Sequence, residues 1–404
     1  MSSRHCCGCQ APVLFRGSAD KVNGSASPGI TLGHDHNDVS ITLNRRSNLK
    51  KFMSKTQRTL PTFSNSRTST FRRTLLAWYD AQKRDLPWRA SRDPYRVWLS
   101  EIMLQQTRVA AVLEHYREFL RRFPNIEKLA AARESSVLAA WSGLGYYRRA
   151  RMLHAAAKLL VRQHAGKFPS TAKELLSLPG IGRYTAAAVA SIAFGEPLAV
   201  VDGNVDRVLE RLSGKQLPEQ QLWKAANLLL DRNRPGDFNQ AMMELGAMVC
   251  TPRSPLCLTC PVAERCATRG ELTVTPKPPR QKKREIHCAL VLHNGDFRTP
   301  EFGDGECPKS NKDGRQSEVL LVLRSRTASL MPGMWELPAL ATSNRNANPL
   351  FTLRHSITVT DYTVRVWRTA APAETRGRWI PIERLSRLPL TGLARKILRK
   401  AQLL

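Results

Sequence analysis

Apolar residues recur with the three-to-four-residue period of amphipathic helices over most of the segment from Phe71 to about Gly270. Ala-rich stretches alternate there with Pro, Gly and Asn, which end helices and open turns. This pattern predicts an all-α domain at residues 71–270. Its clearest helical segments are 94–122, 135–141, 148–163, 172–178, 183–194 and 220–231, followed by the apolar stretch FNQAMMELGAMV.

The pattern changes beyond residue 270. Residues 271–285 include TVTPKPPRQKKR, whose prolines and bases predict an extended linker. After it come short runs rich in β-branched residues, which predict strands, and a final basic helix at 393–402. The runs are HCALVLH, EVLLVLR, SITVTDYTVRVW and RWIPI. We therefore expect a second domain of α/β or α+β type at residues 286–404.

The distribution of charge gives further information about the amino terminus and about the whole chain. Residues 1–70 show no sustained period, and no acid occurs between Val39 and Tyr79, which predicts a disordered basic tail. Its excess of Arg and Ser also resembles an organelle transit peptide, and a translation start at Met53 is the alternative. Lys and Arg total 63 against 33 Asp and Glu, a net charge of +30. Such an excess favours a polyanionic partner, DNA or RNA before a membrane, and no apolar run is long enough to span a bilayer.

Four cysteines, Cys250, Cys257, Cys260 and Cys266, have the spacing C-x6-C-x2-C-x5-C. Four thiolates within seventeen residues can wrap one metal centre, either tetrahedral zinc or a [4Fe-4S] cluster. Structural zinc usually takes its ligands as two close pairs, whereas here one cysteine precedes a group of three. The spacing therefore favours an iron-sulfur cluster, with zinc as the alternative.

A Gly-containing turn, LPGIGRYT, separates two predicted helices. Gly180 and Gly182 permit a tight turn whose backbone amides face outward at the start of the next helix, and such amides can hold a phosphate. Helical hairpins without ligands also use glycine, so the turn alone is a weak signal.

Two carboxylates stand out by their surroundings. Glu101 lies in the apolar stretch WLSEIMLQQT, and Asp202 follows the apolar run 197–201. A carboxyl group in apolar surroundings has a raised pKa and can act as a general acid. Two carboxylates in unlike environments suit cleavage of a glycosidic bond. Glu101 could equally be a solvated helix-face residue, and Asp202 a helix N-cap.

Taken in order, the motifs resemble those of the adenine DNA glycosylases, within the helix-hairpin-helix superfamily. The motifs are LPWR, WLSEIMLQQT, WSGLGYY, LPGIGRYTA, VDGNV, FNQAMMELG and the four-cysteine loop. The resemblance covers residues 71–269. It implies removal of adenine mispaired with 8-oxoguanine or guanine in duplex DNA, with a [4Fe-4S] cofactor.

The resemblance also implies residue roles. Glu101 would protonate the adenine, Asp202 would stabilise the sugar cation or a covalent intermediate, and Tyr184 would assist. Trp88, Arg89, Leu104, Val109 and Glu244 would line the pocket for the extruded adenine. Gln105, Gln106 and Tyr146 would fill or wedge the duplex, with Thr107 beside them.

The residue type at position 184 distinguishes two kinds of relative. Members similar to endonuclease III carry a hairpin lysine, whose amine forms a Schiff base and cleaves the strand. Because this chain has tyrosine there, we expect a monofunctional glycosylase. The alternatives are a bifunctional pyrimidine glycosylase and lyase, and a non-catalytic DNA-binding module.

The C-terminal domain resembles the Nudix-like domain of the same family through EVLLVLRSRTASLMPGMWELP, and the resemblance implies recognition of the 8-oxoguanine. No REx2EE-type glutamate box follows, so nucleotide hydrolysis is not expected. Where the family often has an aromatic-Ser/Thr-His loop, this chain has Ile357, Thr358 and Val359. Thr358 keeps a hydrogen-bonding group, but the stacking and imidazole contacts of such a loop would be missing. We therefore expect looser discrimination between 8-oxoguanine and guanine, or a contribution from other residues.

For partners and location, the same reading predicts a monomer that binds double-stranded DNA containing A:8-oxoguanine or A:G mispairs and does not bind membranes. We expect a bacterial cytoplasmic protein of the nucleoid, or a nuclear or mitochondrial one if the basic tail is a targeting segment.

Overall fold

The computed structural model describes residues 65–270, 282–293, 317–340, 348–357, 360–373 and 375–404. The predicted tail therefore lies outside the described residues up to residue 64, as do residues 271–281 of the predicted linker and Thr358. No helix of the described part is both long and apolar enough to cross a bilayer.

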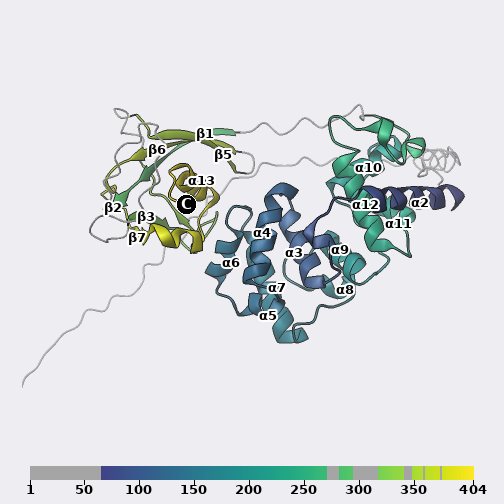
Figure 1. Cartoon of the computed structure of the whole chain (residues 1–404), viewed down its shortest axis with the longest axis horizontal. Helices are drawn as coiled ribbons and strands as arrows, with labels where there is room; N and C mark the ends of the chain where they lie inside the picture. The colour runs from purple at the N-terminus through teal and green to yellow at the C-terminus, as the bar shows by residue number, and fades with distance from the viewer. Residues whose placement is uncertain (1–64, 271–281, 294–316, 341–347, 358–359, 374) are drawn as a thin grey trace, which may run out of the picture. The chain divides into compact units, whose positions relative to one another are not determined.

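Residues 65–270 form helices joined by short turns, as the periodicity predicts (Figure 1). The α-helices are α2 (Asn65–Gln82), α3 (Pro94–Leu104), α4 (Val109–Arg122), α5 (Ile126–Ala131), α6 (Glu134–Trp141), α7 (Arg148–His164), α8 (Ala172–Leu175), α9 (Arg183–Ala193), α10 (Gly203–Ser213), α11 (Glu219–Leu229) and α12 (Pro235–Met248). Short 3-10 turns lie at η1 (Pro87–Arg89), η2 (Cys257–Thr259) and η3 (Ala263–Arg265).

These helices bury two separate apolar cores. One core is built from α3 to α9, around Trp98, Phe119, Trp141 and Leu153. The other joins α2 to α10, α11 and α12, so the first described helix packs with the last ones of the helical region (Figure 1). The helical region therefore has two lobes, and the chain crosses between them after α2 and again after α9.

Three predicted boundaries are wrong. The predicted helix 94–122 is two helices, α3 and α4, because the chain turns at residues 105–108, where Gln106 adopts a φ of 54°. Residues 65–70 of the predicted tail belong to α2, where Phe71 and Leu75 anchor the helix in the second core. The last residues of the predicted linker, from Lys282, belong to a strand because they pair in register with residues 360–363.

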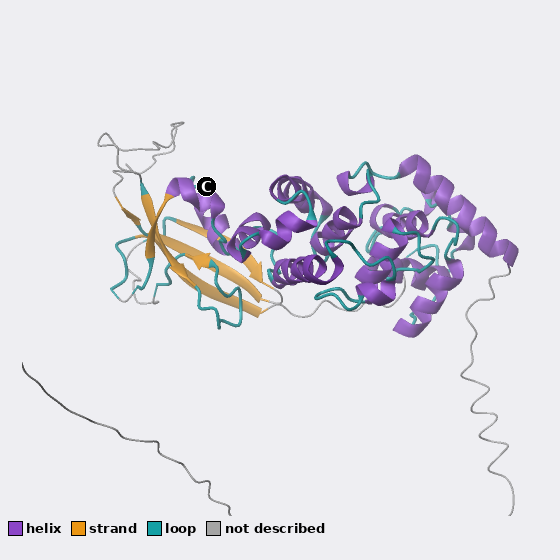
Figure 2. Ribbon diagram, turned by 90° about the horizontal axis from the view of Figure 1, so that it is seen from below, coloured by secondary structure: helices purple, strands orange, loops and turns teal. Residues whose placement is uncertain are grey.

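The C-terminal region contains two small sheets and a helix, consistent with the predicted α+β class (Figure 2). In the first sheet β6 (Thr360–Arg368) lies between β1 (Lys282–Leu290), to which it is parallel, and β5 (Phe351–Ile357), to which it is antiparallel. In the second, β3 (Glu318–Leu323) pairs with β2 (Leu292–His293), β4 (Trp335–Glu336) and β7 (Arg378–Pro381). The 3-10 helix η4 (Ile382–Arg387) and α13 (Gly392–Lys400) follow, and both sheets and α13 share one core.

Candidate active site

Glu101 is a buried carboxyl group, not a solvated one. It lies on α3, and only 7% of its surface is exposed. The Tyr184 hydroxyl, from the first turn of α9, donates a hydrogen bond to Glu101 Oε2 at 2.8 Å. Two residues 83 positions apart are thus brought into direct contact.

The surroundings of Glu101 raise its pKa to about 7. Burial is the main cause, because an ionised carboxylate loses its hydration there. The Tyr184 hydrogen bond opposes this rise, the negative charge of Asp202 adds to it, and the positive charge of Arg89 reduces it. A carboxyl group with this pKa can hold and release a proton at neutral pH.

Asp202 is the N-cap of α10, which confirms the helix-cap alternative predicted from the sequence. Its Oδ1 accepts hydrogen bonds from the backbone N–H groups of Asn204 and Val205 at 3.0 and 2.8 Å. The Asn204 side chain donates to Oδ2 at 3.0 Å. The cap does not exclude a chemical role, because Asp202 also acts electrostatically on Glu101 and Tyr184. The two carboxylates come from different lobes and influence the same site.

Glu244 is a third buried acid, but its surroundings are ionic. Arg84 and Arg89 both donate to its two carboxylate oxygens, at distances between 2.6 and 3.1 Å. Burial alone would raise the pKa of Glu244, yet these hydrogen bonds lower it to about 2. Arg84 has no signal in the sequence, because a single arginine before LPWR looks like any surface base.

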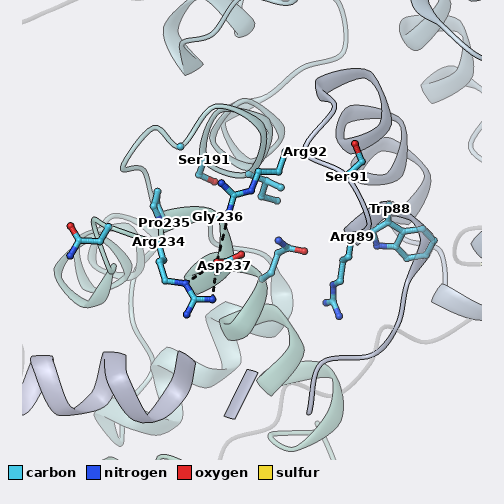
Figure 3. Close-up of a pocket in the computed structure, with 13 residues that line it drawn as sticks. Trp88, Arg89, Ser91, Arg92, Ser191, Arg234, Pro235, Gly236 and Asp237 are labelled. Atoms are coloured by element: carbon cyan, nitrogen blue, oxygen red, sulfur yellow. Dashed lines mark hydrogen bonds and ion pairs between the residues drawn. The ribbon is translucent and has the colours of Figure 1, made fainter. Parts of the chain in front are cut away.

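The remaining residues predicted to line the adenine pocket, Trp88, Leu104 and Val109, belong to or pack on the first core. Trp88 is buried against Tyr116, with ring centroids 5.4 Å apart, and Leu104 and Val109 pack against the first core. Trp88 and Arg89 also line a groove of about 120 Å³ that ends at the start of α12 (Figure 3). Glu101, Tyr184 and Asp202 are not among the residues that line this groove.

The residues predicted to enter the duplex lie on two turns. Gln105, Gln106 and Thr107 form the turn between α3 and α4, and the Gln105 amide donates to Thr185 Oγ1 at 3.2 Å. Tyr146 lies on the turn before α7, is 49% exposed and has a φ of 47°. Gln106 in the first turn and Tyr146 in the second both adopt left-handed backbone angles although neither is glycine. Such a conformation is rare, and it strains the backbone.

The glycine turn before α9 has the predicted geometry. Gly180 adopts a φ of 77°, and a Cβ there would meet Met152 Cβ at 2.5 Å, so no larger residue fits. Gly182 is the N-cap of α9, makes no side-chain cap and faces open space. Free amides at the start of α9 therefore remain accessible to an anion.

The four cysteines offer a suitable donor set for a cluster. All are free thiols, and Cys250, Cys257 and Cys266 each act electrostatically on Cys260. N–H groups point at the sulfurs, from Arg211 to Cys250 at 3.3 Å and from the Arg269 backbone to Cys266 at 3.4 Å. Among the residues that the structure describes, no three or more His, Cys, Asp or Glu side chains are arranged so that they could hold a metal ion.

Helix α10 connects the carboxylate site to the cysteine segment. Arg207 donates to Asn204 Oδ1 at 2.9 Å and to the Cys250 carbonyl at 2.7 Å. Asn204 in turn holds Asp202. The sequence motif VDGNV drew attention to Asp202 alone, whereas the structure shows that Asn204 and Arg207 fix its position.

Two family models match this chain. Residues 99–227 match the family model of the HhH-GPD superfamily base excision DNA repair proteins. Residues 250–266 match the iron-sulfur binding domain of endonuclease III, which confirms the predicted iron-sulfur cofactor over zinc.

Several curated proteins are similar over a longer stretch. The adenine DNA glycosylase of Mus musculus is 40% identical over 312 residues, which are 67% of this chain and 61% of that protein. The chain thus spans about three fifths of the length of that relative. The adenine DNA glycosylase of Schizosaccharomyces pombe is 41% identical over 329 residues, covering 70% of this chain and 71% of that protein. A solved structure of a thermostable thymine-DNA glycosylase is 32% identical, with a TM-score of 0.49, and covers 51% of this chain and 98% of that one.

Proposed function

Because the chain belongs to the adenine DNA glycosylase family, we propose that it removes adenine mispaired with 8-oxoguanine or guanine from duplex DNA by hydrolysis of the N-glycosidic bond. The observation that carries this proposal is the buried Glu101, held by Tyr184 and facing the charge of Asp202. An enzyme acting on a base inside a duplex must first extrude that base to bring it to the catalytic groups.

The two carboxylates would have different tasks. Adenine is a poor leaving group until it is protonated, and Glu101, with a pKa of about 7, would supply a proton from a buried carboxyl group. Departure of the base leaves positive charge on the sugar, which the fixed carboxylate of Asp202 would stabilise. Tyr184 would hold the Glu101 side chain in place through its 2.8 Å hydrogen bond.

The extruded adenine would lie against residues from both lobes. Trp88, Leu104 and Val109 would offer apolar surface. Arg89 and Glu244, which are paired to each other, would offer polar groups. Meanwhile Gln105, Gln106 and Tyr146 would occupy the gap left in the base stack.

We propose a monofunctional enzyme. Strand cleavage needs an amine that forms a Schiff base with the opened sugar. The hairpin position carries Tyr184, and none of the groups that shift the pKa of Glu101 is a lysine. These observations favour a glycosylase without lyase activity over an enzyme that also cleaves the strand.

The iron-sulfur segment would organise DNA binding and not the chemistry. Cys250, Cys257, Cys260 and Cys266 would hold a [4Fe-4S] cluster, which crosslinks the loop that follows α12. Arg253 and Arg265 lie on this loop, and with the amides at Gly180 and Gly182 they would contact phosphates. DNA affinity would then fall steeply with salt.

The C-terminal region would act as a Nudix-like domain that recognises the base opposite adenine. Its mixture of two sheets and a basic helix is compatible with such a role. Thr358 remains the proposed contact, and comparison of A:8-oxoguanine with A:G duplexes in a Thr358→Ala variant tests it. The proposals of a monomer and of a cytoplasmic or organellar location rest on sequence alone.

The decisive experiment is single-turnover incubation with duplexes containing A:8-oxoguanine, A:G and A:T, each scored with and without alkali. The proposal predicts adenine loss from the first two, seen as strand breaks mainly after alkali. Robust breaks without alkali would instead indicate a lyase. Tight binding without base loss from any duplex would indicate a non-catalytic DNA-binding module.

A further inference from the structure

Arg149, in the first turn of α7, has an unusual environment for a cation. Its guanidinium group is partly buried, and burial lowers its pKa to about 10. The other group that shifts this pKa, among the described residues, is the Tyr146 phenol and not a carboxylate. A buried charge without an ionic partner is costly unless dipoles replace its hydration.

Backbone carbonyls supply those dipoles from one side. Arg149 Nη1 donates to the carbonyls of Ile102 and Met103 at 2.7 and 3.0 Å, and also to that of Gln105. The first two belong to the last turn of α3, where carbonyls lack helical partners and the helix dipole is negative. Arg149 thus caps the helix that carries Glu101.

The same guanidinium group holds the turn that follows α3. Arg149 Nη2 donates to Thr107 Oγ1 at 3.1 Å, while Thr107 Oγ1 donates to the Gln105 carbonyl at 3.2 Å. Gln106, with its φ of 54°, lies between these two anchored residues. The strained conformation of Gln106 is therefore held from both sides.

Arg149 also reaches the second turn. Its Nη2 atom approaches the carbonyls of Leu144 and Gly145 at 3.3 and 3.4 Å. Its guanidinium carbon lies 5.4 Å from the centre of the Tyr146 ring and 5.5 Å from that of Trp141. Tyr146, with its φ of 47°, is thus fixed by contact with the same group that fixes the turn at Gln106.

We propose that Arg149 is a positioning residue that clamps the two duplex-entering turns, residues 105–107 and 144–146, in the one relative arrangement that extrudes the base. This inference rests on the proposed function. It assigns to Arg149 neither contact with the substrate nor a proton transfer. Its action is to keep Gln106 and Tyr146 in place before DNA arrives.

The geometry requires arginine. The acceptors lie on two separate chain segments, and a planar guanidinium with several fixed N–H groups can reach both at once. A lysine ammonium keeps the charge but has three donors at a single point. Arg149→Lys should therefore hold one turn and release the other, whereas Arg149→Met should release both.

The test compares the wild-type chain, Arg149→Met and Arg149→Lys, with Arg162→Met as a matched control. Arg162 is exposed in the last turn of α7, so its loss changes the charge equally without touching either turn. Three properties are measured on the cluster-containing protein. They are the single-turnover rate of adenine loss from an A:8-oxoguanine duplex, the fluorescence of 2-aminopurine placed at the target position, and affinity for a duplex that already lacks the target base.

We expect Arg149→Met to lower the adenine-loss rate about 30-fold, because several charge-assisted hydrogen bonds are lost. The increase in 2-aminopurine fluorescence when the protein binds should fall by a similar factor. Affinity for the duplex without a target base should stay within about threefold, because no base has to be extruded there. Arg149→Lys should be intermediate, and Arg162→Met should match wild type.

Wild-type extrusion by a folded Arg149→Met protein would overturn the inference. If Arg149→Met loses its cluster or unfolds at a lower temperature than wild type, the Arg149→Lys variant provides the test. Wild-type extrusion by Arg149→Lys would then overturn the inference as well. A loss of affinity for the duplex without a target base that is as large as the loss of adenine excision would show a general structural role and overturn the positioning inference. Failure of the wild-type protein to remove adenine would instead refute the proposed function.

Discussion

Two buried glutamates in the same helical region have opposite electrostatic states. Glu101 is surrounded by the apolar core and one tyrosine hydroxyl, and its pKa rises to about 7. Glu244 is even less exposed, at 1%, yet two guanidinium groups hold its pKa near 2. Burial alone therefore does not determine the protonation of a carboxyl group; the charge of its hydrogen-bond donors does.

This difference gives a physical basis for the two roles that the motifs assigned to these glutamates. A carboxyl group that is half protonated at neutral pH can donate a proton, whereas one that is always ionised can only bind or orient. Glu244 therefore holds the Arg84 and Arg89 side chains in place, and Glu101 is the candidate acid.

The largest expected effect is on chemistry at Glu101. Glu101→Gln removes the proton donor but keeps an acceptor for Tyr184, so single-turnover adenine loss should fall roughly 10³-fold. Glu114→Gln, at an exposed position of α4, is the matched control and should keep the wild-type rate. A Glu101→Gln rate within tenfold of wild type would exclude Glu101 as the acid.

The next effect concerns Asp202. Asn caps a helix about as well as Asp, so Asp202→Asn should preserve the start of α10 while removing the charge that stabilises the sugar. We expect excision to fall roughly 10²- to 10³-fold with DNA affinity unchanged. Circular dichroism checks the fold. Parallel loss of binding would show that Asp202 is only a structural cap.

The stability of the two glutamate variants should change in opposite directions. The Glu101 pKa is raised, so the folded state loses stability as pH rises from about 4.5 to 7, and at pH 8 Glu101→Gln should stabilise the protein by about 2 kcal/mol. The Glu244 pKa is lowered, so its contribution is complete above pH 4.5 and is lost only as pH falls toward 2. Glu244→Gln should therefore destabilise the protein at pH 8 by about 3 kcal/mol.

Urea unfolding at pH 8, followed by circular dichroism, measures both differences. Glu114→Gln should change the free energy of unfolding by less than about 0.5 kcal/mol. Shifts of the same sign for Glu101→Gln and Glu244→Gln would contradict the comparison.

The smallest effect is expected at Tyr184. Its hydroxyl lowers the pKa of Glu101 against the larger effect of burial, so Tyr184→Phe should raise that pKa further. The pH above which excision declines should move upward, with a rate change at pH 7 of less than about tenfold, as expected for one hydrogen bond. Stopped-time assays between pH 5.5 and 9 measure it. A downward shift would mean that Tyr184 does not donate to Glu101.

The helices could be predicted from the sequence because periodicity is local, and the motifs pointed to Glu101 and Tyr184, which the structure brings into contact. The division of segment 94–122 could not, since neither Gly nor Pro marks residues 105–108 and the turn is held by Arg149 from a distant helix. Arg84 was missed for the same reason, because only the fold brings it to Glu244. The motifs suggested the residues near Glu101, but tertiary contacts alone determine its pKa.

The central claim is that Glu101 acts as an acid with a pKa near 7, and the pH dependence of single-turnover adenine excision tests it most directly. The rate for wild-type protein on an A:8-oxoguanine duplex should be constant below about pH 6.5 and fall tenfold per pH unit well above pH 7, because the protonated form is active. A rate that rises with pH, or that stays constant through pH 8.5, would contradict this assignment.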